Sequence, residues 1–174
     1  MEDSINYRSL TTPYASQIIG LILPIQQIEF GVPIDIDAQP DLQDIQRHYH
    51  ATGGGFWGAF HGDELVGTIG LIPFGGSGAA IRKMFVKKEY RGGVHGVAAR
   101  LLQLATDHGR ETGIDALYLG TVALLKASHR FYEKNGFNRI DPGDLPAAFP
   151  RMPVDTMFYT LKIESSRSGP TFAG

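Results

Sequence analysis

A glycine-rich turn before a helical pattern is the segment of this sequence best suited to bind a ligand. The stretch YRGGVHGVAARLL, residues 90–102, places Gly92, Gly93 and Gly96 directly before a leucine-rich run. The first N–H groups of a helix have no partner within the helix, and they carry the positive end of the helix dipole. Glycines would let an anion approach these N–H groups closely. The turn therefore predicts binding of a pyrophosphate group without a metal ion.

The same turn has a plainer interpretation, a flexible turn in which a glycine serves packing. From this stretch alone both interpretations stay open, because a glycine-rich turn before a helix is a weak signal. Two common phosphate-binding motifs are excluded. No Gly-Lys-Ser/Thr follows the glycines, so this is not a Walker loop. The preceding strand does not begin a βαβ repeat, so this is not the dinucleotide-binding fingerprint either.

Composition narrows the class of protein. The 174 residues suit one domain with a full core. A formal net charge of −2 gives no electrostatic case for binding nucleic acid or an anionic membrane. Cysteine is absent, which excludes disulfides, thiol nucleophiles and cysteine-ligated metals. The first ten residues do not resemble a signal peptide, and the apolar run 18–25 is too short to span a bilayer. We therefore expect a cytoplasmic protein that binds neither nucleic acid nor a membrane.

Hydrophobic periodicity predicts the elements that must position the turn. The expected helices lie within 13–30, within 39–50, from 97 to Gly109 or Gly113, and within 123–137, and the expected strands lie at 5–10, 55–60, 64–74, 79–86, 115–121, 137–140 and 155–163. Pro24 should break or kink the first helix, and Pro40 suits the first position of the second. This order predicts an α/β fold, a mixed and mostly antiparallel sheet with helices on both faces. One domain is expected over 1–163, followed by a disordered tail over 164–174.

Two segments together resemble the GNAT superfamily of acyl-CoA-dependent N-acetyltransferases. They are VKKEYRGGVHGVA, residues 86–98, and ASHRFYEKNGF, residues 127–137. The predicted order of elements also matches that family's fold over about residues 5–163. The resemblance implies a splayed pair of strands, one before the glycine turn and one at 115–121.

The resemblance also implies roles for individual residues. In this family the turn holds the pyrophosphate of coenzyme A on main-chain N–H groups, and the strand before it pairs with the pantetheine arm. The implied cofactor-binding residues are Phe85, Val86, Arg91, Gly92, Gly93, Val94, His95, Gly96, Val97, Ala98 and Ser128. A tyrosine near the thioester sulfur acts as general acid, and Tyr132 matches it. Lys83 and Thr121 are the candidate acceptor-binding residues.

Several positions depart from the family's pattern. The turn is two residues longer than usual between Arg91 and its end. The common asparagine seven residues before the tyrosine is Leu125, so Ser128 and Lys126 are the candidates for its contact to the cofactor. Many relatives carry a glutamate on the strand before the turn as general base, whereas here the strand carries Arg82 and Lys83 and no acid. Glu29, in a segment that borders the acceptor site in this family, is the candidate base.

The sequence therefore predicts an N-acetyltransferase that uses acetyl-CoA as co-substrate and no metal. Without cysteine, the acetyl group would pass directly to a primary amine of a small molecule or amino acid. The cations on the strand favour an acceptor that carries a carboxylate. A homodimer is compatible with this interpretation. The alternative is a catalytically silent acyl-CoA sensor or interaction module on the same fold, which the missing strand glutamate favours and Tyr132 disfavours.

Overall fold

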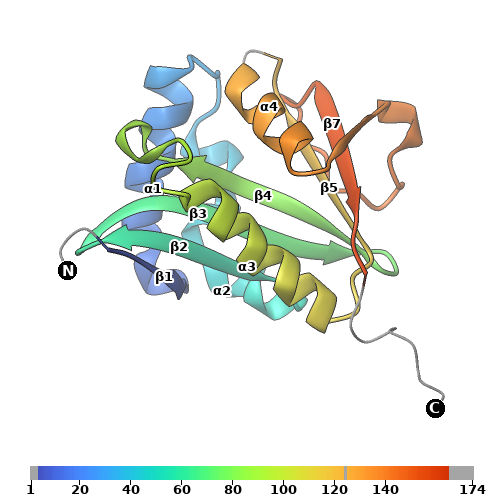
Figure 1. Ribbon diagram of the computed structural model, residues 1–174, viewed down its shortest axis with the longest axis horizontal. Helices are drawn as coiled ribbons and strands as arrows, with labels where there is room; N and C mark the ends of the chain where they lie inside the picture. The colour runs from blue at the N-terminus through green and yellow to red at the C-terminus, as the bar shows by residue number, and fades with distance from the viewer. Residues whose placement is uncertain (1–3, 124, 165–174) are drawn as a thin grey trace. The chain divides into compact units, whose positions relative to one another are not determined.

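The computed structural model describes residues 4–123 and 125–164. Seven strands are hydrogen-bonded in the order β1-β2-β3-β4-β5-β7-β6, and helices accompany them (Figure 1). This is the mixed, mostly antiparallel α/β sheet that the sequence predicts. Contacts divide the chain into two compact units, Met1–Ile72 with Ile81–His108 and Pro73–Ala80 with Gly109–Gly174. The single-domain boundary stays a prediction, and all but Glu164 of the predicted tail lies outside the described residues.

Four strands form the sheet of the first unit. They are β1 (Ile5–Ser9), β2 (Gly55–His61), β3 (Glu64–Phe74) and β4 (Gly78–Val86), of which β3 and β4 begin or end in the second unit. β1 and β2 are antiparallel, as are β2 and β3. Gly62 has φ +63° in the turn between β2 and β3, a conformation that favours glycine. β2 and β3 therefore form a hairpin through this turn.

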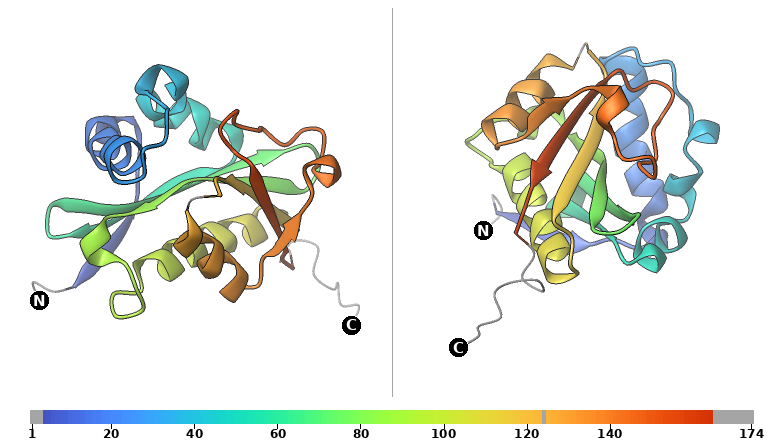
Figure 2. Two further views of the ribbon diagram at one scale, coloured as in Figure 1. Left: turned by 90° about the horizontal axis from the view of Figure 1, so that it is seen from above. Right: turned by 90° about the vertical axis from the view of Figure 1, so that its right-hand side faces the viewer.

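Helices cover both faces of this sheet. Figure 2 (left) shows α1 (Ala15–Pro24) and α2 (Ile45–His48) on one face and α3 (Val97–Glu111) on the other. The buried core between the sheet and α1 and α2 consists of Leu10, Ile18, Leu21, Ile22, Ile25, Leu42, Ile45, Tyr49, Phe56, Phe60 and Leu65. Burial of these side chains is the main force that holds the unit together, at roughly 1.5–3 kcal/mol for each large side chain.

The regular α-helical winding of the first helix ends at Pro24, where the sequence predicts a break or kink. Pro24 is the last residue of α1, and the chain passes directly into a π-helical turn, η2 (Ile25–Glu29). The N–H of Phe30 donates to the carbonyl of Ile25 at 3.1 Å, a bond between residues five apart. Proline has no N–H to donate and its ring crowds the preceding turn, which explains why the regular pattern gives way here.

The prediction of one continuous second helix is wrong. The chain forms three short pieces instead, a 3₁₀ turn η4 (Pro40–Gln43), α2, and a 3₁₀ turn η5 (His50–Thr52). Asp44 interrupts the first two, since its backbone is not helical and its carboxylate accepts from the N–H of Arg47 at 3.1 Å. The predicted apolar face is nevertheless confirmed, because Leu42, Ile45 and Tyr49 are fully buried.

The second unit contains the remaining strands and helix. They are β5 (Ala116–Thr121), α4 (Lys126–Lys134), β6 (Asn138–Ile140) and β7 (Met157–Lys162). The first residues of β4, Gly78–Ala80, pair in parallel with Ala116–Tyr118, while β7 runs antiparallel to both β5 and β6. Both β4 and β5 continue beyond their short paired stretch. Ala80, Phe149 and Phe158 form a buried cluster in this unit. Among the described residues, no helix is long and apolar enough to cross a membrane.

Candidate active site

The glycine turn leaves its backbone open in the structure. A short 3₁₀ turn, η6 (Lys88–Tyr90), leads into it, and α3 begins at Val97. Gly92 and Gly96 have φ of +98° and +63°, and a Cβ built at either position would meet nothing within 4 Å. Among the described residues, no backbone carbonyl accepts a hydrogen bond from the N–H of Gly93, Val94 or His95. The turn thus presents unused donors beside the N-terminus of a helix, as an anion site requires.

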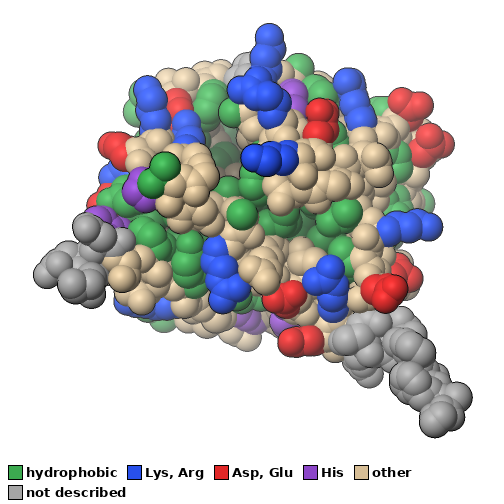
Figure 3. Space-filling model, in the orientation of Figure 1, with side chains coloured by type: hydrophobic (Ala, Val, Ile, Leu, Met, Phe, Trp, Pro, Cys, Tyr) green, Lys and Arg blue, Asp and Glu red, His purple; other side chains and the backbone are tan. Residues whose placement is uncertain are grey.

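The sides of the turn carry exposed and aromatic groups. Val94 is 96% exposed at its tip. His95 is also exposed, with its ring centroid 5.4 Å from that of Tyr90. The hydroxyl of Tyr90 lies 2.7 Å from Nδ1 of His61. Lys, Arg, Asp and Glu side chains are interspersed among the described residues on the face in Figure 3. Within residues 91–98 only Arg91 carries a fixed charge, so a ligand at the turn would meet mainly main-chain dipoles.

Arg91 and Glu29 form a bidentate ion pair. Nη2 of Arg91 donates to Oε1 of Glu29 at 2.7 Å, and Nη1 donates to Oε2. Nε of Arg91 donates to the carbonyl oxygen of Val86 at 2.9 Å. The hydrogen bonds from Arg91 lower the pKa of the Glu29 carboxyl, which makes Glu29 a weaker proton acceptor. The predicted base and the first residue of the predicted phosphate turn therefore contact each other.

The predicted pantetheine-binding residues lie at the end of β4. Val86 is buried, and its carbonyl is already engaged by Arg91. Phe85 is partly buried and packs against the core of the first unit. The N–H of Lys87, the next residue, donates to the carbonyl of Val66 at 2.8 Å. These contacts fix the end of β4 immediately before the turn.

Lys83 lies in a buried polar network. Its side chain is 5% exposed, and Nζ donates to Oε1 of Gln39 at 2.6 Å and lies 3.7 Å from Oδ2 of Asp41. Tyr49 donates to the same Asp41 oxygen at 2.5 Å. Gln39 also exchanges two hydrogen bonds with Gln26, at 2.9 and 3.0 Å. The structure thus shows partners within the chain for this predicted acceptor-binding cation.

The backbone at Lys83 is unusual. Its φ is +53°, the only positive value at a non-glycine position among the described residues. The hydroxyl of Thr68 donates to the carbonyl of Lys83 at 2.8 Å, and this hydrogen bond helps to hold the unusual backbone conformation. A strained backbone and a buried charge at one residue are both costly, and such costs are concentrated at functional sites.

Tyr132 is a buried residue of the second unit. It is 7% exposed, and its ring centroid lies 5.5 Å from that of Phe137 and 5.9 Å from that of Tyr159. Burial raises the pKa of the Tyr132 phenol well above its usual range near 10, and the Asp155 carboxylate adds to the increase. Tyr132 therefore remains protonated at neutral pH and can donate a hydrogen bond.

Other polar groups gather at the end of β5. Thr121 is 7% exposed, and its carbonyl accepts from the N–H of Thr156 at 2.9 Å. His129 of α4 lies 2.9 Å from the carbonyl of Val122 through Nε2. Ser128 is partly buried in the first turn of α4. The sequence missed Asp155, because no motif or periodicity marks a single acid in the proline-rich loop.

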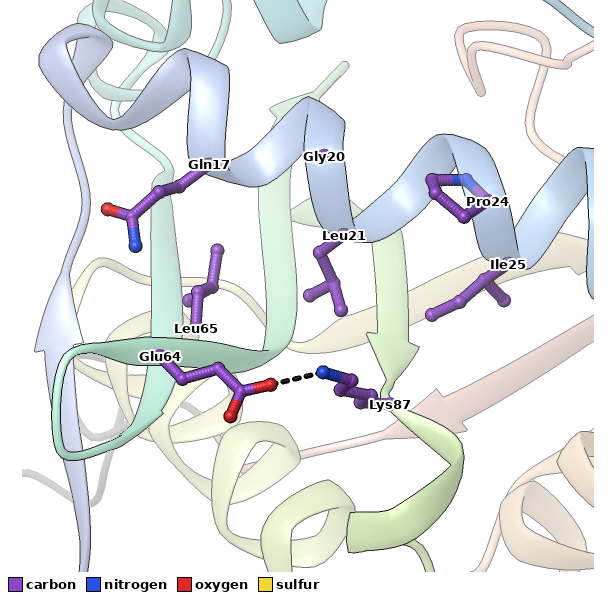
Figure 4. Close-up of a pocket in the computed structure, with 8 residues that line it drawn as sticks. All are labelled: Gln17, Gly20, Leu21, Pro24, Ile25, Glu64, Leu65 and Lys87. Atoms are coloured by element: carbon purple, nitrogen blue, oxygen red, sulfur yellow. Dashed lines mark hydrogen bonds and ion pairs between the residues drawn. The ribbon is translucent and has the colours of Figure 1, made fainter.

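A separate pocket of about 310 Å³ lies beside α1 in the first unit. Figure 4 shows Leu21, Ile25 and Leu65 as its apolar lining, with the Glu64–Lys87 ion pair at one side. None of the predicted site residues lines this pocket.

Comparisons with known proteins agree with this geometry. The sequence model of the Acetyltransferase (GNAT) family matches residues 21–137. A GNAT-family acetyltransferase from Staphylococcus aureus Mu50 is 40% identical, with a TM-score of 0.88 over 91% of this chain and 99% of that one. The uncharacterized N-acetyltransferase YjgM of Escherichia coli is 34% identical over 65% of this chain and 70% of its own length.

A zebrafish N-acetylaspartate synthetase is 27% identical over 139 residues, and the chain spans about half of its length, 48%. A Thermoplasma acidophilum N-acetyltransferase solved with coenzyme A shares the fold at 19% identity, with a TM-score of 0.71. The family match over residues 21–137, the 40% identical solved structure and the observed sheet lead to one conclusion: the chain belongs to the Acetyltransferase (GNAT) family.

Proposed function

We propose that the protein is an N-acetyltransferase that transfers the acetyl group of acetyl-CoA to a primary amine. The observation that carries this proposal is the open turn at residues 91–98, where glycines leave unused N–H groups beside the start of α3. The N–H groups of Gly93, Val94 and His95, together with those of the first helical residues, would hold the pyrophosphate. No metal is needed for this contact.

The reaction proposed is a direct transfer. The neutral amine nitrogen attacks the thioester carbonyl carbon and forms the amide C–N bond, the carbon–sulfur bond breaks, the sulfur leaves as a thiolate, and the nitrogen releases its extra proton to water or to a basic group. The chain has no cysteine, so no cysteinyl intermediate forms. Tyr132 stabilises the thiolate by donating its phenolic proton or a hydrogen bond. Its raised pKa keeps the phenol protonated, as a hydrogen-bond donor must be, and also makes it a weaker acid, which favours the hydrogen bond over full proton transfer.

The acceptor proposed is an amine that also carries a carboxylate, such as an amino acid. Arg82 and Lys83 stand on β4 where many relatives have a glutamate, and β4 contains no acid. The name of the zebrafish relative, N-acetylaspartate synthetase, supports the same class of acceptor. Lys83 would bind such a carboxylate by exchanging its contact with Gln39 or Asp41. Thr121 remains the proposed contact on β5.

Two measurements test the proposal. Coenzyme A should raise the melting temperature without added divalent metal, because ligand that binds only the folded chain stabilises it. The rate at which the free thiol of coenzyme A is released should then be measured with a panel of amino acids and polyamines. We expect an amino acid to be the best acceptor. A panel in which spermidine is better than every amino acid would refute the acceptor class, while the acetyl-transfer proposal would stand.

The second candidate is an acyl-CoA sensor without catalysis. The pairing of Glu29 with Arg91 favours it, since this leaves the predicted base engaged. Binding of coenzyme A together with no turnover across the full amine panel would identify the sensor.

A further inference from the structure

The Glu29–Arg91 pair connects two segments that are 62 residues apart in the sequence. Glu29 is the last residue of the π turn that follows α1, and Arg91 opens the glycine turn. Both belong to the first unit. The pair therefore links the end of the first helix to the turn proposed to bind coenzyme A.

The Glu29–Arg91 pair has a well-defined geometry. The two nitrogens Nη1 and Nη2 contact the two carboxylate oxygens, which is the fork arrangement that arginine forms with a carboxylate. The side chains are 33% and 26% exposed for Arg91 and Glu29, so water screens them only in part. The guanidinium carbon also lies 5.5 Å from the ring centroid of Phe30, which packs against the core. The Arg91 side chain is thus held from three directions.

The position of Glu29 is unfavourable without its partner. A carboxylate at the C-terminal end of a helix meets the negative end of the helix dipole, which destabilises it. Arg91 removes this repulsion and adds two charge-assisted hydrogen bonds. The two hydrogen bonds from Arg91 therefore account for a carboxylate at this unfavourable position.

The remaining Arg91 contact reaches the end of β4. Nε donates to the carbonyl of Val86, so the guanidinium joins β4, the glycine turn and the segment Glu29–Phe30. The turn itself has glycines at three of its positions and would otherwise be the least restrained part of this region. A turn held in one conformation loses less entropy when it binds a ligand.

We infer that Glu29 is a positioning residue for coenzyme A, which acts through Arg91 to hold the phosphate turn in its binding conformation. This inference rests on the proposed function, because it assumes that the turn binds coenzyme A. It assigns to Glu29 a role in cofactor affinity and leaves proton transfer from the amine to another group or to water.

The experiment compares Glu29→Gln, Arg91→Gln and the double variant with the wild-type chain. Coenzyme A affinity is measured by titration calorimetry at fixed salt, and kcat and KM for acetyl-CoA are measured across pH with the best acceptor of the panel. Glu29→Gln should weaken coenzyme A binding on the order of 10-fold. At saturating acetyl-CoA, its kcat and the pH profile of kcat should match those of the wild type. The double variant should bind no more weakly than Arg91→Gln, because the pair acts as one unit.

Glu64→Gln is the matched control. It removes the Glu64–Lys87 ion pair of the same unit, which is more exposed than the Glu29–Arg91 pair and lies at the pocket beside α1 (Figure 4). Its coenzyme A affinity should equal that of the wild type.

Four outcomes would overturn the inference. In the first, Glu29→Gln leaves the affinity for coenzyme A unchanged, lowers kcat and removes the fall of kcat at acidic pH. That result would identify Glu29 as the base. Tighter binding would show that Glu29 competes with the phosphates for Arg91. Additive effects in the double variant would show that the two residues act separately. Equal losses of affinity in Glu29→Gln and Glu64→Gln would show only a general effect of charge. Wild-type protein that fails to bind coenzyme A would instead refute the proposed function itself.

Discussion

Gly120 of β5 lies directly against the carboxylate of Asp155. A Cβ built at residue 120 would come within 2.5 Å of Oδ2 and within 3.0 Å of Cβ of Asp155. The N–H of the next loop residue, Thr156, donates to the carbonyl of Thr121 and holds the loop beside the strand. The absence of a side chain at residue 120 is what allows the acid to lie there.

Replacing Gly120 with alanine should therefore destabilise the protein. The added methyl must displace the Asp155 side chain, and overpacking of this kind costs about 1–3 kcal/mol. Urea unfolding monitored by fluorescence would measure the loss. In a Gly120→Ala background, Asp155→Ala should restore part of the lost stability, since a smaller side chain leaves room for the methyl. Equal stability of Gly120→Ala and wild type would show that the loop moves freely.

Tyr132→Phe should lower turnover on the order of 10²-fold while coenzyme A affinity stays the same. The variant keeps the packing against Phe137 and Tyr159 and loses only the hydroxyl. Turnover with saturating acetyl-CoA and acceptor would be measured beside calorimetric binding of coenzyme A. Near-wild-type turnover, where chemistry limits the rate, would assign Tyr132 to packing alone.

Tyr132 should also make the protein less stable at alkaline pH. Burial raises the folded-state pKa of Tyr132 above the unfolded value near 10, so the folded chain retains a proton that the unfolded chain releases. The free energy of unfolding should therefore fall as the pH rises from about 10 toward the folded-state pKa. Tyr132→Phe should show a shallower decline than wild type in chemical denaturation from pH 9 to 11. Parallel curves would mean that the phenol does not ionise differently in the two states.

Gly96→Val should weaken coenzyme A binding by on the order of 10-fold or more, about 1.4 kcal/mol. A branched side chain strains the backbone at φ +63° and fills the open space where the phosphates would approach. Gly62 is a matched control, because it has the same φ of +63° and the same open surroundings in the β2–β3 turn. Gly62→Val should lose similar stability and retain its coenzyme A affinity. If both variants bind equally, the site lies elsewhere.

Tyr49→Phe should destabilise the first unit by about 1.5–3 kcal/mol, the usual value of a hydrogen bond to a charged group. Its hydroxyl donates to Asp41, which also faces the Lys83 ammonium. Chemical denaturation would measure the change. Tyr14→Phe is the comparison, since the Tyr14 ring packs on the same core and no hydrogen bond from its hydroxyl occurs among the described residues. A loss no larger than that of Tyr14→Phe would mean that the network adds little stability.

Local patterns were sufficient to predict most elements. Strand β3 spans Glu64–Phe74 as the apolar pattern predicts, and the glycine turn leads into a helix at Val97. Both depend on neighbouring residues, through side-chain alternation and through the backbone freedom of glycine. The second helix failed for an equally local reason, because Asp44 competes for the backbone N–H of Arg47.

The polar contacts of the site could not be predicted in the same way. Glu29 and Arg91 are 62 residues apart, and Lys83 and Gln39 are 44 apart, so no sequence period connects them. Strand alternation places Arg82 and Lys83 on opposite faces, but it gives no warning of a left-handed backbone at Lys83. These features arise from tertiary packing, which a single sequence does not reveal.

The π turn after Pro24 sets the direction in which Glu29 points. A π turn contains one residue more than the α-helical turn that it replaces, and each residue of an α-helix advances the side chain by about 100°. If the same five residues, Ile25–Glu29, were wound as a regular α-helix, the carboxylate would be rotated away from Arg91 by about that angle. The ion pair at the glycine turn thus depends on the winding of the chain before residue 29 as much as on the identity of the acid there.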